Sequence, residues 1–138
     1  MILLDTDHFS ILSDQMNSRS ADLTARVQAS RGVPIATTIV SVEEQLGGWL
    51  ALIHRLQDVH KQLTAYAKLG NFITFLSRWT IIPLDQRAAD EFQRLRRQKI
   101  RVGTQDLKIA CIALVNGALL LSANLRDFRR VPDLRVES

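Results

Sequence analysis

The chain has 138 residues, enough for one domain that buries about two-thirds of the surface of its unfolded state. Its apolar stretches fall well short of the ~20 residues that span a bilayer, and its N-terminal run lacks the basic flank of a signal peptide. We therefore expect a cytoplasmic protein with no membrane contact. A net charge of +4 is compatible with a polyanionic partner but does not demonstrate one.

Five short aliphatic runs along the chain predict strands. Runs of large aliphatic residues without polar alternation are typical of buried parallel strands. The expected strands are Ile2–Leu4, Ile35–Val40, Thr80–Leu84, Ala118–Leu121 and a weaker Leu134–Val136.

Segments with helical spacing separate these runs. Apolar residues recur every three or four positions, and the last segment is apolar nearly all round, which indicates a buried helix. The paired Gly47-Gly48 weakens the first helix but permits close packing there. We expect helices over 42–56, from Val59 onward, from an Asp85 cap to about Arg101, and from a Thr104 cap to Asn116-Gly117.

The alternation of strands and helices predicts a three-layer α/β/α domain over 1–138, with a mostly parallel central sheet of four to five strands. The only cysteine, Cys111, cannot form an internal disulfide, and its apolar neighbours predict a core position. Three aromatic residues, Trp49, Tyr66 and Trp79, fit core packing better than base stacking.

Acidic and amide side chains follow the predicted strands or open the predicted helices. In a parallel sheet these positions share one edge, where ligands bind. We therefore expect them to converge, although they are far apart in the sequence. The residues are Asp5, Glu43, Glu44, Asp106, Ser122, Asn124 and Asp127.

Asp5 has two interpretations from its own segment. It is either the cap of the next helix or part of a metal or phosphate site, and taken alone the cap is favoured. The other acids reverse that order, because several carboxylates at one edge repel one another unless a cation joins them. Asp7 has no such partners, so the cap interpretation suits it better.

The cation that fits these oxygen ligands is Mg²⁺, with Mn²⁺ as the alternative. Zinc is not expected, because His54 and His60 are six positions apart and do not share a helical face. The number of metal ions, one or two, stays open.

Three segments together resemble PIN-domain nucleases, and especially the VapC-like toxins of bacterial toxin–antitoxin pairs. MILLDTDHFSIL resembles the opening motif of this family, and TTIVSVEEQLGGW resembles its second motif. VGTQDLKIACIALVNGALLLSANLRDFRRV resembles the third and fourth motifs. No single motif is specific, but their order and spacing cover the whole chain.

The resemblance assigns roles residue by residue. Asp5 and Asp106 match the main metal ligands of the family. Glu44 matches its catalytic glutamate, since Gly48 follows four residues later. Glu43 is the alternative candidate for this role. The fourth acidic position of the family falls on Asn124, an amide.

Three further residues complete the predicted site. Asp127 is a candidate to replace the missing fourth carboxylate, and Ser122 stands where a Thr or Ser often contacts the site. Arg126 lies beside Asp127 as a substrate contact. The basic run from Arg94 to Arg101 is either a second phosphate contact or merely a solvated helix face.

The implied chemistry is hydrolysis of phosphodiester bonds by metal-activated water, with Glu44 or Asp127 orienting the water. The resemblance implies an RNA substrate. Attack by metal-activated water needs no 2′-hydroxyl on the substrate, so a DNA substrate stays open. It further implies a homodimer and a cognate antitoxin, for which the predicted helical hairpin over 42–79 is a candidate surface. The alternatives are a catalytically inactive binding module and a receiver-like phosphoacceptor domain.

Overall fold

The computed structural model describes residues 1–13, 20–29 and 32–138. In these ranges the strands are β1 (Ile2–Leu4), β2 (Ile35–Thr38), β3 (Ile81–Ile82), β4 (Leu119–Leu121) and β5 (Arg135–Glu137). The helices are α1 (Thr6–Ser13), α2 (Ser20–Ala29), α3 (Ile39–Arg55), α4 (Val59–Leu76), α5 (Gln86–Arg97), α6 (Thr104–Val115) and the short α7 (Leu125–Phe128).

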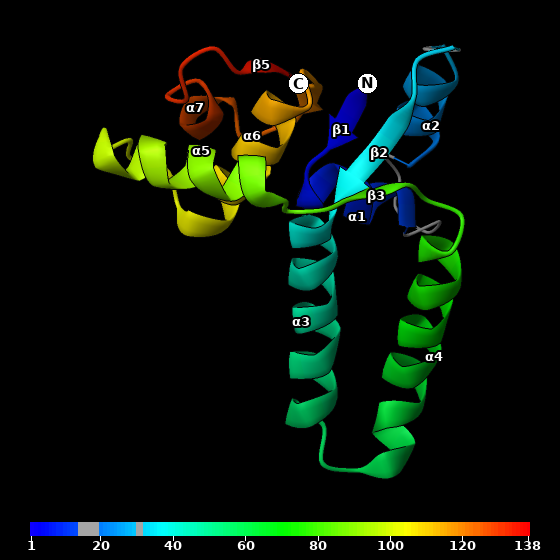
Figure 1. The fold of residues 1–138 in the computed structure, drawn as a ribbon. Coiled ribbons are helices and arrows are strands. Elements are labelled where there is room, and N and C mark those ends of the chain that lie inside the picture. The colour runs from blue at the N-terminus through cyan, green and yellow to red at the C-terminus, as the bar shows by residue number, and fades with distance from the viewer. Residues whose placement is uncertain (14–19, 30–31) are drawn as a thin grey trace.

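The strands form one sheet in the order β3-β2-β1-β4-β5, and every neighbouring pair is parallel. Because β1 lies in the middle, Leu3 pairs with Ala36 on one side and with Leu120 on the other. The carboxyl end of β1, and Asp5 after it, therefore lies at the centre of one sheet edge (Figure 1). The predicted fold class, with its parallel five-stranded sheet, is confirmed.

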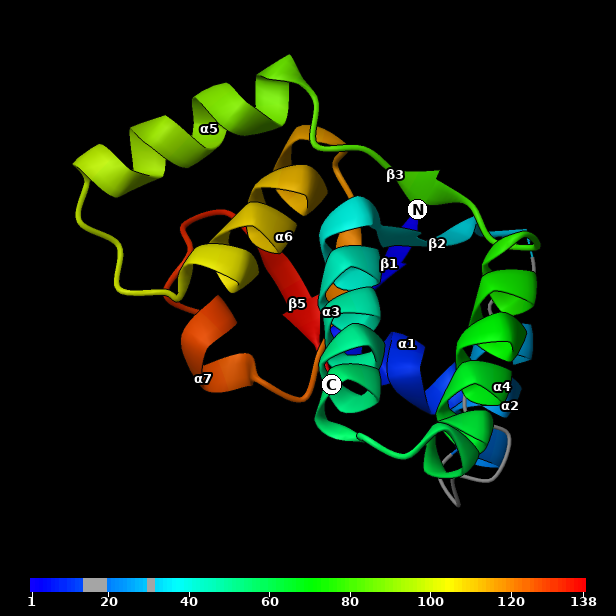
Figure 2. The same ribbon diagram turned by 90° about the horizontal axis from the view of Figure 1, so that it is seen from below.

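Helices cover both faces of the sheet (Figure 2). Leu3 and Leu120 point to the face packed by α5 and α6, whereas Leu4 and Leu121 point to the opposite face, where Phe9 of α1 meets Phe72 of α4. This division follows from the two-residue period of a strand, which sends adjacent side chains to opposite faces. Both faces are covered at the centre of the sheet, which explains why β1 and β4 consist of aliphatic residues alone.

Helix α6 is the buried helix that the sequence predicted. Six of its residues between Leu107 and Ala113 are buried, including Cys111, which is fully enclosed. Burial raises the pKa of the Cys111 thiol to about 12, so the group stays a neutral core side chain. Gly117 follows the Asn116 cap at φ +59, a left-handed conformation that ends the helix at the predicted place.

Several predicted boundaries are wrong by one to four residues. The strand expected over Ile35–Val40 stops at Thr38, because the Thr38 hydroxyl accepts a hydrogen bond from the Ser41 backbone N–H at 3.1 Å and caps α3. Thr104 was expected to cap α6, but Gly103 is the cap residue, and the Thr104 hydroxyl accepts from Arg96 instead.

The boundaries of α5 and of the outer strands also differ from the predicted ones. Asp85 caps α5 as predicted, but that helix ends at Arg97 rather than near Arg101. The outer strands are shorter or displaced, with β3 over Ile81–Ile82 and β5 over Arg135–Glu137. Helices α2 and α7 were not predicted.

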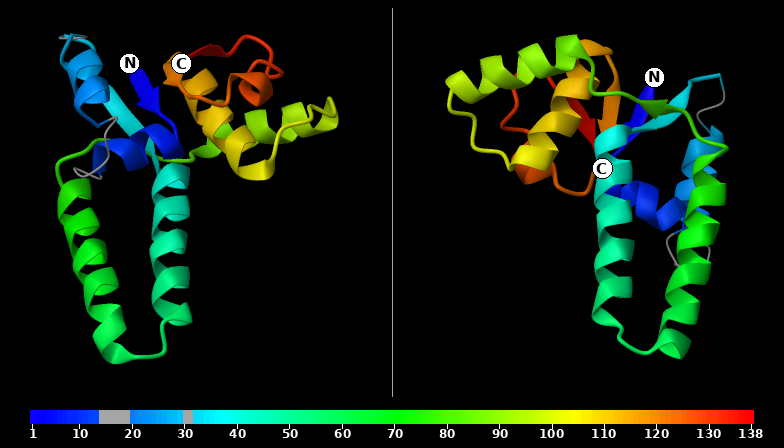
Figure 3. Two further views of the ribbon diagram at one scale, coloured as in Figure 1. Left: turned by 180° about the vertical axis from the view of Figure 1, so that it is seen from behind. Right: turned by 60° about the horizontal axis from the view of Figure 1, so that its bottom comes forward.

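Helices α3 and α4 form an arm that projects beyond the sheet (Figure 3). The Gln62 amide closes its turn by donating to the carbonyl groups of Ile53 and Leu56. The expectation of core packing holds in part for Trp79, which lies edge-on to Phe9. It is wrong for Tyr66, which is 54% exposed on the arm.

Close packing at the paired glycines of α3 is also not observed. A Cβ added at Gly47 or Gly48 would meet no atom within 4 Å beyond the helix's own backbone. Among the helices that the structure describes, none has both the length and the apolar character needed to cross a membrane.

Candidate functional site

Asp5 serves as the cap of α1 and also as a buried carboxylate at the sheet edge. Its Oδ1 accepts a hydrogen bond from the His8 backbone N–H at 2.9 Å, and the His8 ring nitrogen Nδ1 lies 3.0 Å from the same oxygen. A carboxylate only accepts, so Nδ1 carries the proton in this contact. Asp7 was expected to be the cap but is exposed, because Asp5 already occupies the cap position.

Glu44 faces the first turn of α1. The Thr6 hydroxyl donates to Glu44 Oε1 at 2.6 Å, which joins the start of α1 to the second turn of α3. Glu43 is exposed, and its Oε1 accepts from the Gln105 side chain at 2.8 Å. The two neighbouring glutamates thus have different surroundings, and Glu44 is the one beside the segment that follows β1.

Asp106 and Asp127 are joined by an amide. The Asn124 side-chain nitrogen donates to Asp106 Oδ2 at 3.2 Å and to Asp127 Oδ2 at 3.1 Å. Asp106 lies in the first turn of α6, and Asp127 lies in α7 after β4, so residues from two elements meet at one edge of the sheet. Asn124 and Asp127 are therefore both present at the site.

The charges of these acids act on one another. Burial raises the pKa of Asp106 above its ordinary value, and the nearby charge of Glu44 raises it further. The hydrogen bond from Asn124 opposes this rise, while the charges of Asp5 and Asp127 add to it. Three other acids thus lie near enough to Asp106 for their charges to act on it, although more than a hundred positions separate Asp5 from Asp127.

Carboxylate oxygens are the ligands that hard divalent cations prefer, and a cation among them would offset this repulsion. In the described ranges, no three acidic, histidine or cysteine side chains are close enough together to enclose a metal ion. The residues that could contribute oxygen ligands to a cation are Asp5 and Asp106, whose carboxylates lie at the same end of the sheet.

Ser122 and Arg126 lie on the segment that leads from β4 into α7. Ser122 is fully buried, and its hydroxyl accepts from the Asn124 backbone N–H at 2.9 Å, which holds the turn that presents Asn124. Arg126 is exposed beside Asp127. Their contact with a substrate stays a prediction.

Part of the basic run from Arg94 to Arg101 makes contacts within the protein. Arg94 pairs with Glu91, while Arg96 donates to the Val102 carbonyl and lies over the Phe92 ring. Arg97, Lys99 and Arg101 are exposed. The solvated-face interpretation therefore accounts for part of this cluster.

Thr6 and His8 belong to the site but were not singled out from the sequence. The signal for His8 was its spacing: the third residue after a cap lies within reach of the cap's side chain. No comparable local signal pointed to the contact between Thr6 and Glu44, because it joins residues 38 positions apart.

No family model matches the chain. A curated relative, the ribonuclease VapC1 of Rickettsia felis, is 32% identical over 89 residues, which cover 61% of this chain and 63% of the relative. The match thus spans less than two-thirds of the relative's length.

Two solved structures extend the likeness to the whole fold. VapBC-1 of nontypeable Haemophilus influenzae superimposes with a TM-score of 0.75 at 23% identity, covering 100% of this chain and 98% of that chain. VapBC-5 of Mycobacterium tuberculosis, described as a member of a family of toxin–antitoxin systems, gives a TM-score of 0.62 at 22% identity, covering 98% and 94%. In its fold the chain is thus similar to these toxin–antitoxin structures, and over part of its length its sequence is similar to a VapC ribonuclease.

Proposed function

We propose that the protein is an endoribonuclease that hydrolyses RNA phosphodiester bonds with Mg²⁺, and that Mn²⁺ can replace Mg²⁺. The observation that carries this proposal is the meeting of Asp106 and Asp127 on the Asn124 amide, with Glu44 and Asp5 near enough for their charges to act on Asp106. Carboxylates that converge in this way favour a site for a divalent cation. The ribonuclease to which the chain is similar supports RNA as the substrate.

Asp5 and Asp106 are the residues that would hold the cation. His8 already fixes one oxygen of Asp5, and Asn124 fixes one oxygen of Asp106, so each carboxylate has a defined orientation and a second oxygen to offer. When bound, the cation neutralises charge on the phosphate and lowers the pKa of a coordinated water.

Glu44 and Asp127 would orient the attacking water. Thr6 occupies Oε1 of Glu44, which leaves the other carboxylate oxygen to accept a hydrogen bond from water. Arg126 and Arg129 are exposed beside Asp127 and would attract the RNA backbone, in an interaction that weakens with salt.

The experiment is incubation of the purified protein with matched RNA and DNA oligonucleotides, in Mg²⁺ and in EDTA. We expect the RNA to be cut only in Mg²⁺, leaving 5′-phosphate and 3′-hydroxyl ends. Equal cutting in EDTA would contradict the role of the cation, and preferred cutting of the DNA would contradict the substrate.

A second candidate function is a binding module without catalysis. It is favoured by Asn124, whose neutral amide already bridges Asp106 and Asp127 and so relieves part of the repulsion. A folded protein that binds RNA in Mg²⁺ but leaves it intact would support this function over the nuclease.

We further propose that the protein is the toxin of a type II toxin–antitoxin pair and forms a homodimer. The arm exposes large apolar side chains that the rest of the described chain does not cover, as expected for a surface that binds a partner. On the arm these are Leu50, Val59, Leu63, Tyr66 and Ile73, each 47–63% exposed.

The partner proposal is tested by co-expression with the products of the two adjacent genes. We expect the two to purify together and RNA cleavage to be suppressed. Leu63→Glu should release the partner without loss of cleavage by the free protein, whereas Arg87→Glu, on exposed α5, should change neither. Retention of the partner by Leu63→Glu would argue against the arm. Light scattering of the isolated protein tests the homodimer.

A further inference from the structure

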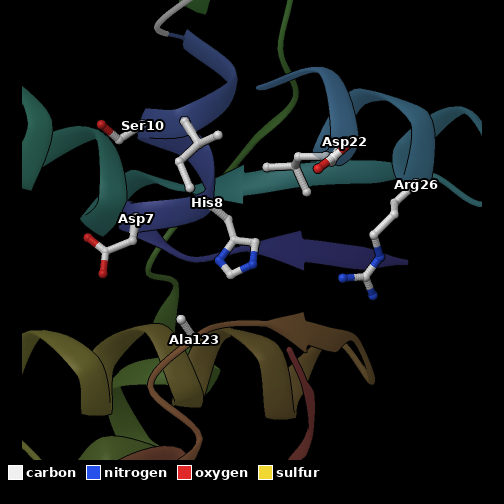
Figure 4. A pocket seen from close by; sticks show the side chains of 8 residues that line it. Asp7, His8, Ser10, Asp22, Arg26 and Ala123 are labelled. Atoms are coloured by element: carbon white, nitrogen blue, oxygen red, sulfur yellow. The ribbon is translucent and has the colours of Figure 1, made fainter. Parts of the chain in front are cut away.

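A pocket of about 420 Å³ opens beside the acidic site, between α1, α2 and the turn after β4. Its size falls within the ~300–1,000 Å³ range of small-molecule sites. Ile11 and Leu23 contribute buried apolar side chains, and Ala123 lines the side nearest the carboxylates. Figure 4 shows the His8 ring pointing from α1 toward Ala123, with Asp22 and Arg26 extending from α2.

His8 connects this pocket to the acidic site. Its Nδ1 edge is held by Asp5, and the ring as a whole is a wall of the pocket. The His8 side chain is only 12% exposed, so the ring has little freedom to turn away. A group in the pocket therefore lies one imidazole ring from the carboxylate that we assign to the cation.

The pocket has two carboxylates and one arginine, Arg26, so its balance of charge disfavours a phosphate group. Asp7 and Asp22 both line it, and two carboxylates beside a phosphodiester group would repel it. Carboxylates accept hydrogen bonds from N–H groups, and every nucleobase carries such a group on its edge. The flat ring of His8 and the apolar side chains suit the faces of a base.

We propose that this pocket holds the base of the nucleotide next to the scissile phosphate, with Asp22 accepting a hydrogen bond from the N–H edge of the base. The inference rests on the proposed function, because it places the RNA backbone at the acidic site. The edges of the four bases carry different N–H groups, so the pocket would favour some bases over others at the cleavage position.

Asp22→Asn tests this contact by the sign of its effect. RNA is a polyanion, so removal of an unrelated negative charge near it should tighten binding slightly. Asn keeps an acceptor oxygen but not the charge, so a hydrogen bond from the base that depends on the carboxylate should weaken, and RNA binding should weaken by roughly tenfold. The measurement is fluorescence anisotropy with a defined RNA in EDTA, where no cleavage is expected, followed by kcat and KM in Mg²⁺.

The matched control is Asp90→Asn, an exposed carboxylate on α5 outside this pocket. We expect Asp22→Asn to raise both the RNA dissociation constant and KM, to leave kcat nearly unchanged and to alter which bases flank the cut. Asp90→Asn should leave all of these near wild type. Asp7→Asn supplies a second carboxylate variant from the other helix, with the same expected direction.

The outcomes separate the two claims. Binding that is unchanged or tighter in both Asp22→Asn and Asp7→Asn, with normal cleavage by wild type, would overturn the base pocket and leave the nuclease standing. Weaker binding in these variants without cleavage by wild type would support the pocket and overturn the nuclease. Wild type that neither binds nor cuts RNA would overturn both.

Discussion

Asn124 donates a hydrogen bond to Asp106 across the edge of the sheet, at 3.2 Å from its amide nitrogen to Oδ2. The same nitrogen reaches Asp127 Oδ2 at 3.1 Å, so a neutral group lies between two carboxylates. At the position where the resemblance leads us to expect an acid, this chain thus has a donor that partly compensates the repulsion. The strength of cation binding should therefore depend on whether position 124 carries an amide or a carboxylate.

Asn124→Asp is expected to strengthen Mg²⁺ binding and to weaken the metal-free fold. The substitution adds a charge beside two carboxylates and removes both donated hydrogen bonds, which should lower the Tm in EDTA by about 4 °C or more. Differential scanning fluorimetry with and without Mg²⁺ measures both effects. A variant that is as stable as wild type in EDTA would show that the amide bridge contributes nothing.

Thr6→Val should lower RNA cleavage while leaving the fold intact. The Thr6 hydroxyl holds Glu44 Oε1 at 2.6 Å, and loss of such a supporting contact typically costs about 10- to 100-fold in activity. Thr6→Ser keeps the hydroxyl and should retain most of the rate. Equal rates for the Val and Ser variants, measured as kcat, would mean that the contact does not position Glu44.

The raised pKa of Asp106 predicts how stability depends on pH. The folded chain binds this proton more tightly than the unfolded chain, so the ionised carboxylate destabilises the metal-free fold at neutral pH, and protonation relieves the penalty as the pH falls through the raised pKa. Asp106→Asn should therefore melt higher than wild type in EDTA at pH 7. This advantage should shrink as the pH falls and be small near pH 4, close to the ordinary pKa of 3.8 that the carboxyl has in the unfolded chain.

Thermal melts of both proteins from pH 7 to pH 4 measure that difference. Asp90→Asn is a suitable control, since Asp90 is an exposed carboxylate on α5. A constant difference between Asp106→Asn and wild type across the pH range would contradict the electrostatic origin of the effect.

Gly47→Ala should stabilise the arm. Glycine inside a helix costs about 0.5–1 kcal/mol relative to alanine, and no atom beyond the helix's own backbone lies within 4 Å of the added Cβ. The midpoint of urea unfolding should rise accordingly. A lower midpoint would indicate a close neighbour at this position that the isolated chain does not show.

The centre of the sheet could be predicted from the sequence because β1 and β4 are unbroken aliphatic runs. Leu3 and Leu120 are both fully buried, and a buried parallel strand needs no polar face. The convergence of the acids followed from the same topology, since the carboxyl ends of parallel strands share one edge. Helix α6 could be predicted for a similar reason, as its apolar residues surround the axis.

The misplaced boundaries and contacts depended on tertiary structure. Val40 continues the apolar run of β2, yet the Thr38 cap turns the chain into α3 two residues earlier. The contact of Thr6 with Glu44 and the placement of Tyr66 on an exposed face depend on how distant elements pack, which periodicity does not encode. Asp5 has a local role, as the cap of α1, and a tertiary one, as a carboxylate at the site. The two roles are compatible.

The most direct test of the account compares RNA cleavage in Mg²⁺ by wild type, Asp5→Asn, Asp106→Asn and Glu43→Gln. Glu43 is a carboxylate of the same helix as Glu44 but contacts Gln105, so its variant is the matched control. We predict that the rate of RNA cleavage falls at least about 100-fold in the two aspartate variants, whose folding is checked by circular dichroism. The rate of Glu43→Gln should stay near that of wild type. Cleavage that persists in Asp5→Asn or Asp106→Asn would contradict the assignment of these acids as the catalytic centre.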